Sequence, residues 1–122
     1  MYLIVFFLIF AFGVPVVSAE NPITLAEIDS KHEKSQLQTG YQEIASQIEK
    51  ILASNPNQYP WQWRQARIQY SLAKKAGESK SDHYDLCILH SSLAIDLQPD
   101  SAVSYFYRGL CRGKQGEING VW

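Results

Sequence analysis

The segment Tyr84–Gly116, YDLCILHSSLAIDLQPDSAVSYFYRGLCRGKQG, contains two helical patterns separated by a proline. In the first pattern, leucines recur at three- and four-residue steps, at Leu86, Leu89, Leu93 and Leu97. The second pattern has apolar residues at similar steps, at Val103, Phe106, Tyr107 and Leu110. Both spacings place the apolar residues on one face of a helix, and Pro99 cannot continue the helix that precedes it. We therefore predict two short antiparallel helices that bury these two stripes against each other.

Small and turn-forming residues in this segment recur at fixed distances. Ala94 is followed by Pro99 after five residues, by Gly109 after ten more and by Gly116 after seven more. This spacing resembles that of the tetratricopeptide repeat, a family of helix-turn-helix units of about 34 residues. The resemblance implies an all-α superhelix of antiparallel helix pairs, in which small residues allow close approach and Pro99 separates two units. It also implies a scaffold that binds a protein or peptide.

An earlier part of the chain repeats this arrangement. Pro56 precedes Ala66 by ten residues, as Pro99 precedes Gly109, and the two prolines are 43 residues apart. Because a unit of the family has about 34 residues, this interval implies an insertion. We place it at residues 76–82, where glycine, serine and charged residues break the apolar pattern.

The domain is predicted to span residues 24–116 and to hold about two and a half units. These are a degenerate unit at 24–57, a full unit at 59–99 and the first helix of a third unit at 101–114. Residues 117–122 are expected to form an irregular or truncated tail, because Asn119-Gly120 opposes a helix. The apolar face of the last helix would then lack a partner. We expect the tail, a second copy of the chain or further sequence to cover it.

Other helices and their ends are predicted from apolar spacing and capping residues. Helices are expected at residues 23–37, 41–54 and 61–73. Thr24 and Glu27 have the spacing of a capping box, and Asp82 is expected to cap the helix that follows the insertion. The string Trp63-Arg64-Gln65-Ala66-Arg67 is also similar to a divergent branch of these repeats, the regulator-of-microtubule-dynamics family and its bacterial relatives. We carry over the fold from that branch and leave its partner aside.

The N-terminal run from Tyr2 to Val17 has no charged side chain. It resembles a secretory signal peptide at residues 1–19, because Val17 and Ala19 suit cleavage after Ala19. The run is also shorter than the roughly 20 residues that span a bilayer as a helix. We expect an exported protein, periplasmic or secreted. The alternative is an uncleaved membrane anchor on an assembly factor, and only then would the chain contact a membrane.

Charge and motif content argue against two functional classes. Eleven Lys and Arg stand against twelve Asp and Glu, which gives a net charge of −1, so a nucleic-acid partner has no electrostatic support. The sequence has no recognisable catalytic triad order, paired catalytic carboxylates or phosphate-binding glycine loop, and His32 has no identifiable nucleophile partner. We therefore predict a protein that is not an enzyme and needs no cofactor.

Candidate partner-binding residues are the arginines and two aromatic residues of the first helices of two units. They are Tyr59, Trp61, Arg64, Arg67, Arg108 and Arg112. In the proteins that this chain resembles, the first helices line a concave groove, where such arginines could clamp a peptide carboxylate. The alternative is a solvated face with salt bridges to Asp or Glu. Tyr59 and Trp61 are expected to be exposed, and Trp63 and Tyr70 to be buried.

The two cysteines, Cys87 and Cys111, lie on helices that are predicted to be neighbours. In an exported protein such a pair predicts a disulfide, with two buried thiols as the alternative. His83, Cys87 and His90 also share one helical face and could offer three ligands to zinc or copper. This metal-binding protein is the second functional hypothesis, and the competing interpretation is that Cys87 packs as a small apolar residue.

Overall fold

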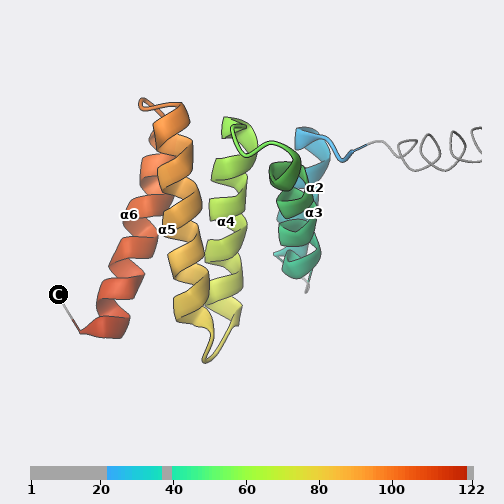
Figure 1. Cartoon of the computed structure of the whole chain (residues 1–122). Helices are drawn as coiled ribbons and strands as arrows, with labels where there is room; N and C mark the ends of the chain where they lie inside the picture. The colour runs from blue at the N-terminus through green and yellow to red at the C-terminus, as the bar shows by residue number, and fades with distance from the viewer. Residues whose placement is uncertain (1–21, 37–39, 121–122) are drawn as a thin grey trace, which may run out of the picture.

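The computed structural model describes residues 22–36 and 40–120, and within them it contains helices and no strand. The helices are α2 (Leu25–Ser35), α3 (Tyr41–Ser54), α4 (Tyr59–Lys75), α5 (Lys80–Leu97) and α6 (Ala102–Asn119). They stand side by side with α4 between the α2–α3 pair and the α5–α6 pair (Figure 1). The all-α prediction is therefore confirmed.

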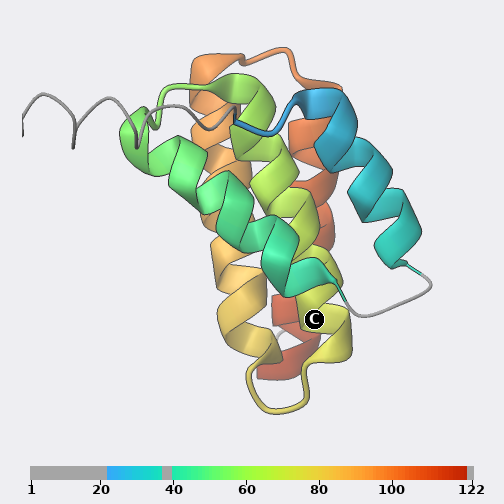
Figure 2. The same ribbon diagram turned by 90° about the vertical axis from the view of Figure 1, so that its right-hand side faces the viewer.

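α4 is the central helix, because it packs against each of the other four. Besides its chain neighbours α3 and α5, it contacts α2 and α6, and α3 crosses it obliquely (Figure 2). Contacts between α3 and α5 are absent from the described part of the chain. The first, third and fifth of these helices, α2, α4 and α6, thus form one side of the molecule.

Two apolar clusters hold the helices together. The larger joins α2, α3 and α4 through buried residues that include Ile28, Ile44, Ile48 and Ile68. The smaller joins α4, α5 and α6 through Ala66, Ala73, Tyr84, Cys87 and Cys111. Because the side chains of the second cluster are mostly small, α4, α5 and α6 can lie close together.

The structure tests the predicted helix ends. Thr24 accepts a hydrogen bond from the Glu27 backbone N–H, and Glu27 accepts one from the Thr24 N–H, so the capping box is confirmed. The insertion predicted at residues 76–82 is shorter, because α5 already begins at Lys80. Its N-cap is Ser79, and the prediction that Asp82 caps the helix is wrong. The two helices that this loop connects, α4 and α5, have 17 and 18 residues.

The C-terminal tail also differs from the prediction. α6 continues through Glu117 and Ile118 to Asn119, so the first half of the expected irregular tail is helical. Gly120 then adopts the left-handed conformation, with φ of 70°. Glycine takes this conformation without the steric cost of a Cβ, and it commonly ends helices there.

The leucine stripe of α5 does not pack against α6, and that prediction is wrong. Its four leucines are 38%, 50%, 37% and 39% exposed, in the order Leu86, Leu89, Leu93 and Leu97. α5 buries a different face, made by Tyr84, Cys87, Ser91, Ala94 and Ile95. The reason is that α5 packs on both α4 and α6, so its buried face is the one between those two helices. Small residues there permit the close approach that leucines would prevent.

The three positions predicted for close helix approach have different outcomes. Ala66 and Ala94 are fully buried, as expected. Gly109 is exposed, and a Cβ built on it would meet no atom within 4 Å. Phe106, which was expected to pack on α5, is 60% exposed beside it. Both lie on the side of α6 that faces away from α5, where no other described helix packs.

The predicted signal peptide or anchor at residues 1–19 lies outside the described residues. Among the helices that are described, none combines the length and hydrophobicity that crossing a bilayer requires.

Candidate functional site

A cleft of about 430 Å³ opens on the side formed by α2, α4 and α6. Its walls come from these helices and from the first residue of α3. The lining residues are His32, Gln36, Tyr41, Arg67, Tyr70, Ser71, Lys74, Lys75 and Tyr107. Three of them are cationic and three are tyrosines, and no carboxylate lines the cleft among the residues that the structure describes.

Helical spacing on α4 supplies most of this lining. Arg67, Tyr70, Ser71 and Lys74 are separated by three- or four-residue steps, which puts them on one face of the helix. The opposite side of α4 carries Ile68 and Leu72, which pack into the larger apolar cluster. The side chains of α4 that face away from this core therefore form the floor of the cleft.

Tyrosines from three helices surround the floor. The ring centroids of Tyr70 and Tyr107 are 6.3 Å apart, and the ammonium of Lys74 lies 5.2 Å from the centroid of Tyr70. Burial raises the pKa of Tyr107, so its phenol stays protonated at neutral pH and can donate a hydrogen bond. Tyr41 closes the far side, where its ring stacks on His32 with centroids 5.8 Å apart.

Asp29 of α2 binds two arginines of α4, one of which, Arg67, lines the cleft. Its two carboxylate oxygens accept hydrogen bonds from Arg64 Nε and Nη2, both at 2.8 Å, and Oδ1 also accepts one from Arg67 Nη2 at 2.6 Å. These hydrogen bonds, that from Arg64 foremost, lower the pKa of Asp29 to about 2. Arg64 and Arg67 also lie over the ring of Trp63, at 4.2 and 5.0 Å from its centroid. Both arginines are therefore held in place by the fold.

The two lysines of the cleft, in contrast to its arginine, form no salt bridge with a described carboxylate. Lys74 and Lys75 are exposed, and within the described residues neither forms a salt bridge. Both lie in the last turn of α4, where their charge also interacts favourably with the helix dipole. They are the cations of the cleft that remain available to a ligand.

The structure gives His32 a partner that the sequence did not reveal. His32 Nε2 lies 3.1 Å from Ser71 Oγ, and this hydroxyl also donates to the backbone oxygen of Arg67 at 3.3 Å. Burial, with a further contribution from Arg67, lowers the pKa of His32 to about 4. An imidazole with so low a pKa is a weak base at neutral pH. The hydrogen bond between the two side chains joins α2 to α4 at the wall of the cleft.

We expect His32 to make the protein less stable in mild acid. Its folded pKa of about 4 lies below the unfolded value of 6.5, so below pH 6.5 the unfolded chain binds a proton that the folded chain does not. The free energy of unfolding therefore loses nothing from this group above about pH 6.5, and it falls toward pH 4 by at most about 3 kcal/mol.

Urea unfolding near pH 7 and near pH 4.5 measures the loss that His32 causes. The variant His32→Gln should lose less, and an equal loss in both proteins would contradict this assignment. Part of the pH dependence should remain in the variant, because burial also lowers the pKa of His90.

The predicted binding residues are dispersed. Trp61 is buried in the larger apolar cluster, so its predicted exposure is wrong. Tyr59 is half-buried, with its hydroxyl 2.7 Å from Ser101 Oγ. Arg108 donates to Ser92 Oγ at 3.4 Å and lies over Tyr105, while Arg112 is exposed. Of the six residues, the cleft brings in only Arg67.

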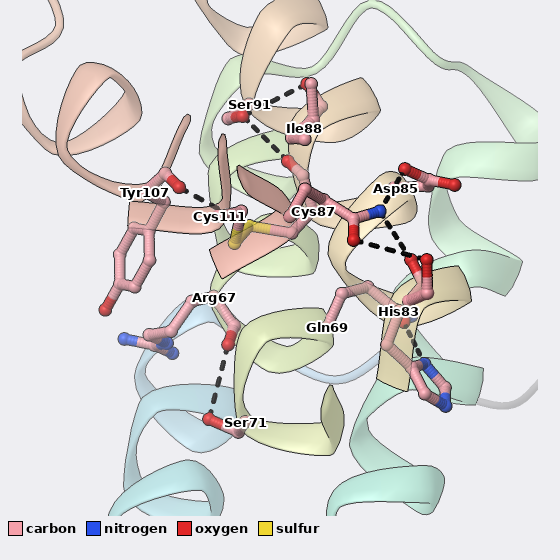
Figure 3. The surroundings of a disulfide bond; sticks show 12 residues. Arg67, Gln69, Ser71, His83, Asp85, Cys87, Ile88, Ser91, Tyr107 and Cys111 are labelled. Atoms are coloured by element: carbon pink, nitrogen blue, oxygen red, sulfur yellow. Dashed lines mark hydrogen bonds between the residues drawn. A yellow bond between two sulfur atoms is a disulfide. The ribbon is translucent and has the colours of Figure 1, made fainter. Parts of the chain in front are cut away.

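The structure joins Cys87 and Cys111 in a disulfide, with their Cα atoms 6.3 Å apart (Figure 3). The sulfur of Cys87 is therefore not free to bind a metal. His83 and His90 each donate from Nδ1 to a glutamine of α4, to Gln69 at 2.8 Å and to Gln62 at 2.7 Å. Across the residues that the structure describes, no three His, Cys, Asp or Glu side chains are arranged to hold a metal ion. The proposed ligand set therefore does not fit this fold.

Most residues of the cleft were not predicted from the sequence. Lys74 and Lys75 follow Arg67 by seven and eight residues, which is two helical turns, and this spacing could have identified them. The contributions of His32, Tyr41 and Tyr107 come from other helices, and no local pattern connects them with α4.

Comparison of the chain with protein-family models, curated proteins and solved structures finds no match.

Proposed function

We propose that this chain is a non-enzymatic scaffold of the tetratricopeptide-repeat type that binds a protein or peptide in the cleft between α2, α4 and α6. The observation that carries the proposal is the lining of this cleft. Lys74 and Lys75 offer positive charge that no described carboxylate neutralises, next to tyrosines that offer flat apolar contact. Such a lining suits a peptide with acidic side chains or a free carboxylate, interspersed with apolar residues.

Two further features support the proposal. Helices α2, α4 and α6 share one side of the molecule, as the first helices of successive repeats would. The buried disulfide favours an oxidising compartment, which agrees with export to the periplasm or beyond the cell. The partner is then a protein or peptide encountered after export.

The test compares two dye-labelled peptides that differ only in charge. One alternates aspartate with leucine and tyrosine, and the other has lysine in place of each aspartate. We expect the acidic peptide to bind in a fluorescence anisotropy titration and the lysine peptide to bind at least about tenfold more weakly, because hydrogen bonds to charged groups contribute roughly 1.5–3 kcal/mol each.

Charge reversal in the cleft provides the control. Lys74→Glu combined with Lys75→Glu should abolish the preference for the acidic peptide. Lys80→Glu changes an exposed lysine at the start of α5, outside the cleft, and should leave binding nearly unchanged. Equal affinity for both peptides, or an equal loss in the two variants, would refute the proposed site.

A further inference from the structure

Helix α5 carries an exposed row of leucines. Leu86, Leu89, Leu93 and Leu97 extend over about 16 Å of the helix axis, at a rise of 1.5 Å per residue. Each is at least 37% exposed, although the buried face of the same helix contains serine, alanine and cysteine. Soluble proteins rarely leave a contiguous apolar patch of this kind without a partner.

Hydrogen bonds to α4 and α6 show which side of α5 carries the leucine row. The α6 side of the helix is marked by Ser81, whose hydroxyl donates to Gln115, and by Ser92, which accepts from Arg108. The α4 side is marked by His83 and His90. At 100° per residue the leucines lie beyond these histidines, on the flank of α5 that faces away from α6. No described helix covers that flank, since α3 and α5 do not touch.

The charges along the leucine row are of one sign. α5 carries three exposed aspartates, of which Asp82 and Asp96 lie next to the leucines, while Asp85 accepts a hydrogen bond from Gln115 of α6. Its one lysine, Lys80, lies at the helix start and on the side toward the buried face. A ligand for this surface therefore needs an apolar stripe flanked by positive charge.

We infer that the leucine row of α5 is a docking surface for a basic amphipathic helix of a partner protein. Such a helix would place apolar residues at i, i+3, i+4 and i+7 between the leucines, and its Lys or Arg would face the aspartates. A second copy of this chain docking through its own α5 fits less well, because it would bring aspartates against aspartates. This surface is separate from the cleft of α2, α4 and α6, so the two proposals can fail independently.

The test uses a designed helical peptide of about 18 residues, the length of α5, with a leucine stripe and lysines elsewhere. Fluorescence anisotropy on the full chain should detect saturable binding that weakens with added salt. Leu89→Ser combined with Leu93→Ser should weaken binding at least tenfold, and circular dichroism should show unchanged helix content because both side chains are exposed. Phe106→Ser removes a large exposed side chain from α6 and should change the affinity less than twofold.

Three outcomes would overturn the inference. The first is unchanged binding in the double leucine variant. The second is that a peptide with glutamate in place of lysine binds as tightly as the lysine peptide and loses as much affinity in the double leucine variant. Charge would then not select the partner. The third is a dimer of the protein alone, seen by sedimentation, that the leucine variant dissociates, because a second copy would then occupy the surface.

Discussion

Replacing Cys87 and Cys111 together by alanine is expected to lower the free energy of unfolding by about 3 kcal/mol. The disulfide closes a loop with a sequence separation of 24 residues, and chain-entropy arguments assign a stabilisation of this size to such a loop. A small domain has only about 5–10 kcal/mol of stability in total. The measurement is the urea midpoint of the double variant compared with that of the oxidised wild type.

Alanine is preferred to serine at these positions because both cysteines are fully buried. A serine hydroxyl there would add the cost of burying a polar group to the loss of the bond. Reduced wild type serves as the control for side-chain packing, since it keeps both sulfur atoms and loses only the disulfide. Equal midpoints for the oxidised protein and the double variant would show that the bond does not stabilise this fold.

Truncating Ile48 to alanine is expected to destabilise the protein by about 3 kcal/mol. Ile48 is fully buried in the cluster that joins α2, α3 and α4. Its truncation removes apolar contacts and leaves a cavity, which typically costs 2–5 kcal/mol. Thermal or urea unfolding of the variant measures the effect.

Ile118→Ala is the matched control, because it makes the same chemical change on α6 where the side chain is 38% exposed. We expect it to cost less than about 1 kcal/mol, since less apolar surface leaves contact with protein. If both variants lost the same stability, Ile48 would not occupy the core position described above.

Local patterns in the sequence predicted the helices well and the buried face of each helix poorly. α3 has the predicted bounds, because Ile44, Ile48 and Leu52 follow one helical face and Asn55-Pro56 ends it. The capping box at Thr24 was also visible, since it depends on two residues of fixed spacing. Such features depend only on residues within one or two helical turns of each other.

Which apolar face becomes buried depends on contacts between distant residues. The leucine row of α5 looked like a core stripe by periodicity, yet α5 packs on two helices through smaller side chains. The two tryptophans show the same limit. Trp61, which was predicted to be exposed, is in the core, and Trp63, which was predicted to be buried, is only partly buried beneath two arginines. Side chains two positions apart point about 200° apart around a helix. An error in the orientation of the helix therefore exchanges core and surface positions.

The cleft was only partly predictable for a related reason. Of the four arginines that were predicted to bind a partner, Arg67 lines the cleft and the other three do not. Asp29, which forms salt bridges with both Arg64 and Arg67, is 35 and 38 residues away from them in the chain. Without the packing of α2 on α4, nothing in the sequence shows that these arginines are paired while Lys74 and Lys75 are not.

The distribution of charge among the helices affects how the protein behaves in solution. α4 and α6 carry Arg64, Arg67, Lys74, Lys75, Arg108, Arg112 and Lys114, with Glu117 as their one acidic residue. Asp82 and Asp96 of α5 lie on another side, so the net charge of −1 conceals an uneven distribution of charge. Near neutral pH and at low ionic strength, such a molecule is expected to adsorb to both cation- and anion-exchange resins, turning a different side to each.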